Sequence, residues 1–220
     1  MSRARVGLIV IVSAGVLLAL LAMVELRHGR PLPADLAIHR WAVRHRPDPL
    51  RESAALITAT GTGVVPYALA MVAGIIAGSG PYGRVLMVVR TVAVLLVVQL
   101  LRLALVTAVG RPRPPVADWA VHVTGFAFPS GHTVTSATAA GILIWAACPR
   151  LHGVVRTVFV ACVTTWAVAV GLSRVYLGVH WPTDVVGGWS FAAVLLGSAV
   201  LLLRRWTARR RCGDQAPSSR

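Results

Sequence analysis

The 220-residue chain contains no lysine, and all 22 of its basic residues are arginine. Acidic residues are also few, seven in total, so the formal net charge is +15. In a soluble protein such an imbalance would suggest a nucleic-acid partner. No basic recognition module is visible, so nucleic acid is not an expected partner. Arginines at helix ends beside anionic lipid headgroups explain the charge more simply.

Cysteine is scarce as well. Cys148, Cys162 and Cys212 show no paired spacing; two lie in apolar stretches and one in the basic C-terminal segment. This pattern indicates neither a disulfide framework nor a zinc site.

Apolar residues, in contrast, make up 56% of the chain, and the mean hydropathy is +0.73. A soluble domain of this length buries only part of so much apolar surface. Six apolar segments stand out, and their lengths are near what a helix needs to cross a bilayer. They run over Val6–Leu26, Ala54–Gly78, Val85–Val109, Thr133–Cys148, Val154–Leu172 and Asp184–Leu203. The first is interpreted as an uncleaved span, because it is long for a signal peptide and no small-residue cleavage site follows.

The pattern predicts an all-α, polytopic membrane helix bundle of about six transmembrane helices. Residues 1–203 form its single domain, and residues 204–220 form a basic, disordered tail. Six spans place both termini on one side, with twelve arginines there and nine on the other. Three of those nine lie in the polar motifs described below. The positive-inside rule therefore predicts cytoplasmic termini in the cell membrane and motif loops on the extracytoplasmic side.

One segment of the first loop is amphipathic. Asp35–Arg44 is compatible with a short helix in the membrane interface, with Leu36 and Trp41 facing inward. The simpler interpretation is a solvated basic loop with no part in catalysis, and this is the interpretation that we favour.

Three polar clusters interrupt the apolar chain, and all fall on the same predicted side. They are Gly110–Pro114 after the third span, Pro129–His132 at the start of the fourth, and Ser173–Asp184 between the fifth and sixth. Convergence of three separate loops is what an active site at the mouth of a bundle requires.

The residue types in these clusters suit a phosphoryl group. Arginine presents a planar fork of donors that matches two phosphate oxygens, so Arg113 and Arg174 can clamp one group. Ser130 is a good N-cap for the helix that follows, and Gly131 lets backbone N–H groups approach an anion. His132 lies in the first turn of that helix, close to any anion bound there.

His180 and Asp184 are four residues apart at the start of the last span. A carboxylate at that spacing can accept the second imidazole N–H and leave the other nitrogen nucleophilic. Each residue alone has an ordinary explanation: an interfacial arginine anchors to headgroups, a serine caps a helix, and a histidine is structural. Asp184 is harder to explain in this way, since an acid inside a span is costly without a partner.

Together the clusters resemble the three-part motif of the type 2 phosphatidic acid phosphatase family, which also includes the vanadium haloperoxidases. Its second part, P-S-G-H, is complete at Pro129–His132, and its third, S-R-x5-H-x3-D, is complete at Ser173–Asp184. The first part, K-x6-R-P, matches only at Arg113-Pro114, with Val106 where the family has lysine. The resemblance covers roughly residues 54–203.

This resemblance implies a membrane phosphatase acting on a lipid or polyprenyl phosphomonoester or diphosphate. His180 would attack phosphorus to form a phosphohistidine, Asp184 would hold it, and His132 would protonate the leaving oxygen. Arg113, Arg174, Ser130 and the Gly131 backbone would bind the phosphoryl oxygens, with no metal or other cofactor. Two alternatives stay open: a metal-assisted hydrolase with His132, His180 and Asp184 as ligands, and a non-catalytic transporter or scaffold.

Because the lysine is missing, either another arginine supplies its positive charge or the site does without it. Arg102 lies on the same helix face as Val106, but helical side chains lean toward the N-terminus and so away from the following loop. Its Cα is also about 6 Å further from that loop, at 1.5 Å per residue. We therefore expect Arg111, beside Arg113, to be the additional substrate-binding residue.

Overall fold

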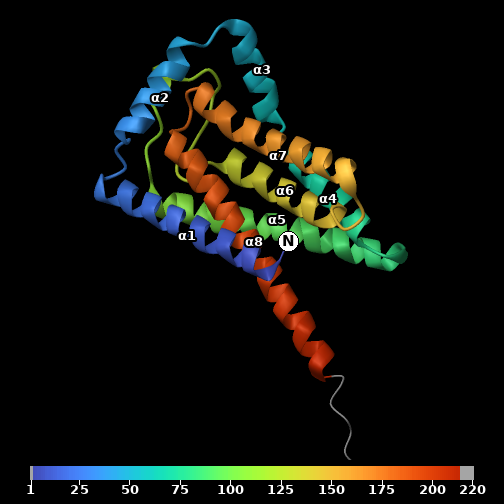
Figure 1. Cartoon of the computed structure of the whole chain (residues 1–220). Helices are drawn as coiled ribbons and strands as arrows, with labels where there is room; N and C mark the ends of the chain where they lie inside the picture. The colour runs from blue at the N-terminus through green and yellow to red at the C-terminus, as the bar shows by residue number, and fades with distance from the viewer. Residues whose placement is uncertain (1, 214–220) are drawn as a thin grey trace, which may run out of the picture.

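The computed structural model describes residues 2–213, and the side chains of residues 2–205. Every regular element in that range is a helix, which confirms the all-α class (Figure 1). The helices are α1 (Arg3–Leu26), α2 (Pro33–Arg44), α3 (Asp48–Ala59), α4 (Val64–Ala77), α5 (Gly80–Val109), η1 (Val116–Asp118, a 3-10 turn), α6 (Gly131–Ala147), α7 (Gly153–Tyr176) and α8 (Pro182–Gly213).

The long helices carry apolar side chains on their outer faces. α5 runs for 30 residues and ends where Gly110 adopts a left-handed conformation with φ of 60°. On its surface Leu100 is 65% exposed, and on α1 Ile11 is 70% exposed. A continuous apolar exterior of this kind is incompatible with water and is what a bilayer solvates.

Four helices of the described chain are long and apolar enough to cross a membrane: α1, α5, α7 and α8. α3 and α4 together form a fifth candidate, bent by 47° at the break between them. α6 has 17 residues, the short limit for a crossing, and is not among these helices. The expected count of six spans is therefore not confirmed, because one predicted span is broken and another is short.

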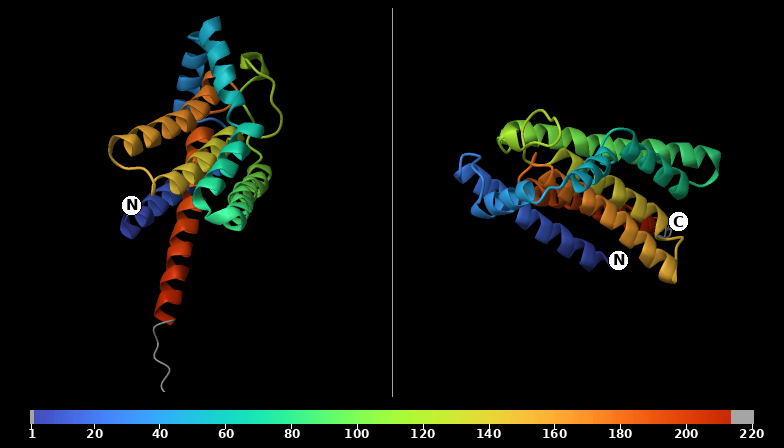
Figure 2. Two further views of the ribbon diagram at one scale, coloured as in Figure 1. Left: turned by 90° about the vertical axis from the view of Figure 1, so that its right-hand side faces the viewer. Right: turned by 90° about the horizontal axis from the view of Figure 1, so that it is seen from above.

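α6 is the central helix of the bundle and packs against α4, α5, α7 and α8. Figure 2 shows it (yellow) between α5 (green) and α7 (orange). Small residues permit this close packing: at Gly141, a Cβ would collide with the side chain of Leu196 on α8. The polar motif at the start of α6 is thereby held among rigid neighbours.

α2 and α3 lie at one end of the bundle, beside the loops that carry the polar motifs (Figure 1). Asp35–Arg44 is helical, as the alternative interpretation predicted, and the solvated loop that we favoured is wrong. The inward face also differs from the expectation: Asp35, His39 and Ala42 are buried, and Trp41 is 58% exposed. Its polar side chains turn inward because they find partners in the motif loops.

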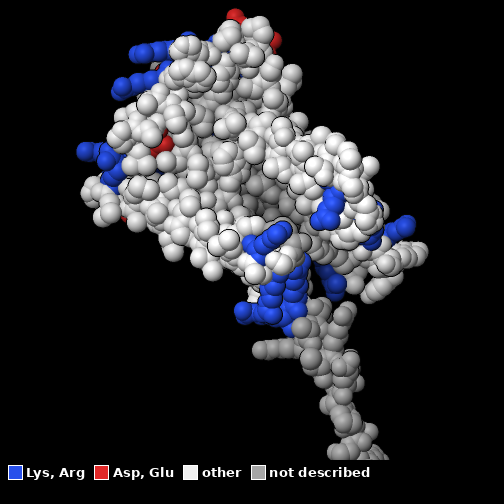
Figure 3. Space-filling view, in the orientation of Figure 1, with Lys and Arg blue, Asp and Glu red and all other residues white. Residues whose placement is uncertain are grey.

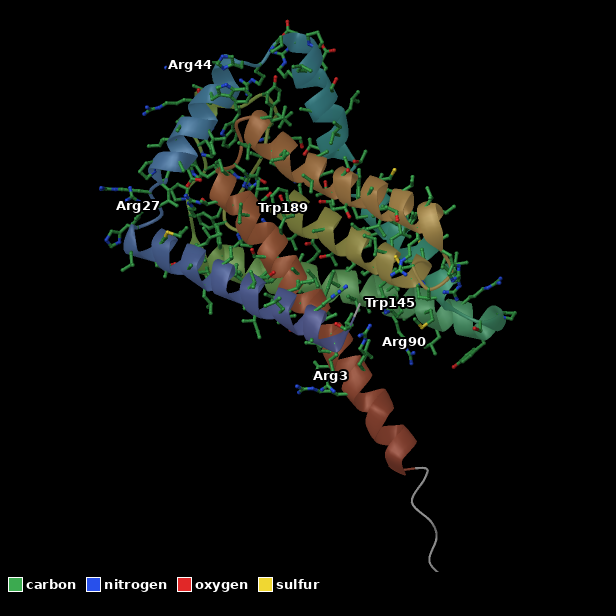
Figure 4. The ribbon with its side chains drawn as sticks, in the orientation of Figure 1. Arg3, Arg27, Arg44, Arg90, Trp145 and Trp189 are labelled. Carbon is green, nitrogen blue, oxygen red and sulfur yellow. The ribbon has the colours of Figure 1, made fainter. Side chains whose placement is uncertain are left out.

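The start of α1 and the later part of α8 lie at the other end of the bundle, and the two helices pack against each other (Figure 1). Figure 3 shows basic residues gathered at that lower end, and Figure 4 places Arg3 and Arg90 there, with Arg27 and Arg44 at the motif end. α8 continues to Gly213 and so includes residues 204–213 of the predicted tail, whereas the rest of that tail lies outside the described residues.

Candidate active site

The three polar clusters meet at the end of the bundle beside α2. Backbone hydrogen bonds join them: Ala127 N–H donates to the Arg111 carbonyl at 2.8 Å, and Ser130 N–H donates to the Asp184 carbonyl at 3.1 Å. The indole of Trp181 donates to the Pro112 carbonyl at 3.1 Å. The predicted convergence of three loops on one site is what the structure contains.

His180 and Asp184 are paired as their spacing predicts. Nδ1 of His180 lies 3.3 Å from Oδ2 of Asp184, and both side chains are buried. On the other edge of the ring, Nη1 of Arg113 lies 2.9 Å from Nε2. Since a guanidinium only donates, Nε2 is the unprotonated nitrogen and Nδ1 carries the proton. The lone pair of Nε2 therefore faces the guanidinium of Arg113.

The electrostatic environment keeps this imidazole neutral. Burial and the positive charge of Arg113 hold the pKa of His180 well below its usual value of 6.5. The carboxylate behind it is fixed by two further donors: the Trp181 N–H at 2.8 Å and Nη1 of Arg111 at 2.6 Å. A neutral imidazole with an oriented carboxylate partner is the arrangement of an activated histidine nucleophile.

The N-terminus of α6 offers donors to an anion. Ser130 is at the N-cap position but its side chain does not cap the helix. Its Oγ is buried, and no partner is present among the described residues; the same holds for Nε of Arg174. Buried polar groups of this kind are normally satisfied, so two unpaired groups beside a helix N-terminus mark a position suited to an oxyanion.

Arg174 and His132 reach the site from α7 and α6. Arg174 is 2% exposed, and its Nη1 donates to Oγ1 of Thr58 on α3 at 3.0 Å. Nε2 of His132 lies 3.3 Å from Oγ1 of Thr62, in the break between α3 and α4. The bend in the second predicted span thus brings two threonines to the site.

Arg102 contacts the second motif, although it was expected to point away from the motif loops. Its Nε donates to the Pro129 carbonyl at 3.2 Å, and its guanidinium covers Gly131, where a Cβ would approach Cζ to 3.0 Å. The prediction failed because it placed the motif loops beyond the end of α5. The segment before α6 instead folds back alongside the last turns of α5.

Arg111 is placed differently from the expected substrate-binding role. Its guanidinium is completely buried between Asp35 of α2, at 2.8 Å, and Asp184, at 2.6 Å. It also donates to Oγ1 of Thr183 at 2.7 Å. These donors are all directed at protein oxygens, and they connect Arg111 to the histidine–aspartate pair.

Sequence reasoning considered Arg102 and set it aside, and it did not single out Asp35. Arg102 had a signal, because a charge inside a span is costly without a role. Asp35 had a weaker one, as the first-turn acid of a segment otherwise rich in arginine. Across the described residues, no group of three or more His, Cys, Asp or Glu side chains is arranged to hold a metal ion.

This arrangement has a counterpart in known proteins. A model of the PAP2 superfamily matches residues 87–209, which is more than half of the chain. The chain belongs to the PAP2 superfamily. The matched region contains most of α5 and all three motifs, whereas α1 to α4, and with them Asp35, lie outside it.

Individual PAP2 relatives agree with this assignment. Phosphatidylglycerophosphatase B of Escherichia coli is 40% identical over 94 residues, which are 43% of this chain and 34% of the relative. Undecaprenyl-diphosphatase of Sulfolobus acidocaldarius is 38% identical over 80 residues, 36% of this chain and 32% of the relative. The aligned segment thus spans about a third of the length of these curated relatives.

A solved PAP2 structure matches over most of the molecule. The crystal structure of a transmembrane PAP2-type phosphatidylglycerolphosphate phosphatase from Bacillus subtilis has a TM-score of 0.72 and 29% identity. The match covers 89% of this chain and 96% of that one. The helices outside the family model are therefore also part of a fold seen in a PAP2 membrane protein.

Proposed function

We propose that this PAP2 protein is an integral-membrane phosphatase that hydrolyses a lipid or polyprenyl phosphomonoester or diphosphate through a phosphohistidine. The observation that carries the proposal is the orientation of His180. Its unprotonated Nε2 faces an arginine cluster, while Asp184 holds Nδ1 from behind. The N-terminus of α6 is joined to Asp184 by the Ser130 N–H, and Ser130 Oγ has no partner within the part of the chain that the structure describes.

The phosphoryl group binds between this helix terminus and three arginines. Arg113, Arg174 and Arg102 donate to its non-bridging oxygens, together with Ser130 and the Gly131 backbone. Charge that develops on these oxygens in the transition state is stabilised by donors already in position. Arg111 takes no direct part, because both sides of its guanidinium are engaged by carboxylates.

The reaction proceeds in two displacements. Nε2 of His180 attacks phosphorus while the bond to the leaving oxygen breaks, and His132, which enters the step protonated, donates the proton that this oxygen needs. Burial and the nearby arginines lower the pKa of His132 to about 3, so the negative charge of the bound phosphate is what keeps this proton on the imidazole. His132, now neutral, removes a proton from water as the water attacks the phosphohistidine. Phosphate leaves, and both histidines return to their starting states. Chain residues and water supply every proton, and no metal is required.

The substrate class is inferred from the relatives and from the apolar exterior of the helix bundle. The relatives are named for phosphatidylglycerophosphate and for undecaprenyl diphosphate, both of which join a phosphate to a long apolar chain. The apolar exterior allows such a chain to stay in the bilayer while its phosphate reaches the motif loops. The charge distribution supports cytoplasmic termini and a site on the extracytoplasmic side of the cell membrane.

A panel assay tests this proposal. Purified protein in detergent should release phosphate from at least one of phosphatidate, phosphatidylglycerophosphate and a polyprenyl diphosphate. Activity should persist in EDTA and be inhibited by vanadate, which resembles the transition state. Activity that is lost in EDTA and restored by a divalent metal would support the metal-assisted alternative; no release from any lipid phosphate would favour the non-catalytic one.

The covalent intermediate has its own measurement. With substrate labelled in the transferred phosphate, an alkaline quench should recover label on the protein, since phosphohistidine survives alkali. His180→Ala should recover none. Label that persists in His180→Ala would contradict the assignment of the nucleophile.

A further inference from the structure

Asp35 is a buried carboxylate far from the motifs in sequence but part of the same hydrogen-bond network. It lies in the first turn of α2 and has no exposed surface. Oδ2 accepts from the Leu32 N–H at 3.1 Å, from Nη2 of Arg111 at 2.8 Å and from Oγ1 of Thr183 at 2.8 Å. Oδ1 accepts from the Thr183 N–H at 3.0 Å.

The last of these contacts places Asp35 at the N-terminus of α8. Thr183 is the second residue of that helix, so its N–H has no partner within the helix. The Asp35 carboxylate, which belongs to α2, accepts this N–H. Its negative charge also interacts favourably with the positive end of the α8 dipole. The next residue is Asp184, which accepts the Trp181 N–H in the manner of a capping box. Asp35 thus fixes the turn from which Asp184 projects.

Arg111 completes a continuous path from Asp35 to the nucleophile. One side of its guanidinium contacts Asp35 and the other contacts Oδ1 of Asp184, while Oδ2 of Asp184 contacts Nδ1 of His180. Oγ1 of Thr183 and the Gly29 carbonyl also accept from Arg111, but only Asp35 and Asp184 carry a negative charge. These two charge-assisted contacts, on opposite sides of the guanidinium, fix its orientation.

We propose that Asp35 is a positioning residue that acts through Arg111 to align the Asp184 carboxylate with His180, and so couples helix α2 to the nucleophile. The idea rests on the proposed function, since the alignment matters only if His180 attacks phosphorus. It assigns a role in the reaction to a helix that lies outside the region matched by the family model.

The test compares Asp35→Asn with Asp118→Asn. The Asp35→Asn side chain keeps the size and one acceptor but loses the charge that faces Arg111. Asp118 is the matched control: its Oδ2 contacts Nε2 of His39 at 2.9 Å, so it also ties α2 to a motif loop through a buried histidine. We expect Asp35→Asn to lower kcat about 10- to 100-fold with KM within threefold, as expected for a charge-assisted contact. Asp118→Asn should change kcat by less than about threefold. Equal losses in both would mean that docking of α2 alone matters, and would overturn the proposal.

A double variant distinguishes positioning from general damage. If Asp35 acts through Asp184, adding Asp35→Asn to Asp184→Asn should lower kcat by less than about threefold further. If the double variant instead loses kcat by the product of the two single-variant losses, the proposed path is refuted. Where Asp35→Asn does not fold, Arg111→Lys serves instead, because an ammonium keeps the charge but cannot bridge both carboxylates with one fork. Activity of Arg111→Lys within about threefold of wild type would equally refute it.

A measurement without substrate separates this inference from the proposed function. In protein labelled with ¹⁵N-histidine, the Nδ1–H proton of His180 should resonate far downfield because of its carboxylate partner. Asp35→Asn should move this resonance upfield, and Asp118→Asn should leave it in place. An unchanged resonance in Asp35→Asn would overturn the inference, even where wild-type protein hydrolyses lipid phosphates normally.

Discussion

Replacing Arg102 by alanine removes a guanidinium that covers the N-terminus of α6. Its Nε is engaged by the Pro129 carbonyl, and its terminal nitrogens lie close to Gly131, on the side where the proposed phosphoryl group binds. The backbone of α5 should tolerate the change, since alanine is a good helix former and the loss of a charge within a span favours membrane insertion.

The expected loss follows from one charged donor. A hydrogen bond to a charged group contributes about 1.5–3 kcal/mol, and each 1.36 kcal/mol is tenfold in rate. We therefore expect kcat/KM of Arg102→Ala to fall roughly 10- to 150-fold. Inhibition by vanadate should weaken by a similar factor, because vanadate occupies the same oxyanion positions. Arg102→Lys should lose less, since it keeps the charge and is the residue type that the family motif carries.

The matched control is Arg90→Ala. Arg90 lies on the same helix twelve residues earlier, is exposed, and is at the opposite end of the bundle (Figure 4). All variants are assayed in one detergent with kcat/KM normalised to folded protein. Arg90→Ala should remain within about twofold of wild type. An Arg102→Ala enzyme within about threefold of wild type, with unaltered vanadate inhibition, would refute a phosphoryl contact for Arg102.

Three further outcomes are expected. Asp184→Asn should retain residual activity, reduced on the order of 10³–10⁴-fold, because it misorients the imidazole without deleting it. Wild-type turnover in this variant, with folding checked by circular dichroism, would contradict the pairing of His180 with Asp184. The pH dependence of kcat/KM should lack an acid limb near pH 6.5, because burial and Arg113 keep the pKa of His180 below that value and its attacking form stays neutral as pH falls. In Arg113→Ala that pKa rises, so the acid limb should move to higher pH; an unshifted limb would count against the contact. For orientation, in a variant without Cys148 and Cys162, a membrane-impermeant thiol reagent applied to intact cells should miss Cys212 yet label Ala117→Cys, and the reverse pattern would contradict the predicted topology.

The motif residues show how much local sequence determines. The four-residue spacing of His180 and Asp184 across the start of α8 brings the carboxylate within reach of the imidazole, as predicted. Ser130 was likewise predicted as the N-cap of an apolar helix, and it occupies that position, although its side chain does not cap the helix. Composition alone indicated the membrane class, because so much apolar surface cannot be buried by a chain of this length.

The number of spans was less predictable. A hydropathy pattern records which residues favour lipid but not where the backbone bends. The apolar stretch over Ala54–Gly78 contains the break between α3 and α4, and that break brings Thr58 and Thr62 to Arg174 and His132. In the sequence, the bent pair of α3 and α4 therefore cannot be distinguished from one continuous span.

The roles of the arginines were decided by tertiary structure. Arg102, Arg111 and Arg113 carry the same guanidinium, and an argument from helix direction predicted Arg111 to face the ligand, whereas its donors are directed at Asp35, Asp184 and Thr183. Which guanidinium meets phosphate and which meets carboxylate depends on how the loop before α6 folds back on α5 and on where α2 docks. Asp35 lies 76 residues from Arg111, and only their 2.8 Å contact shows that it belongs to the site. Sequence determines the chemistry that residues a few positions apart can perform, whereas long-range packing decides which distant charges compensate one another.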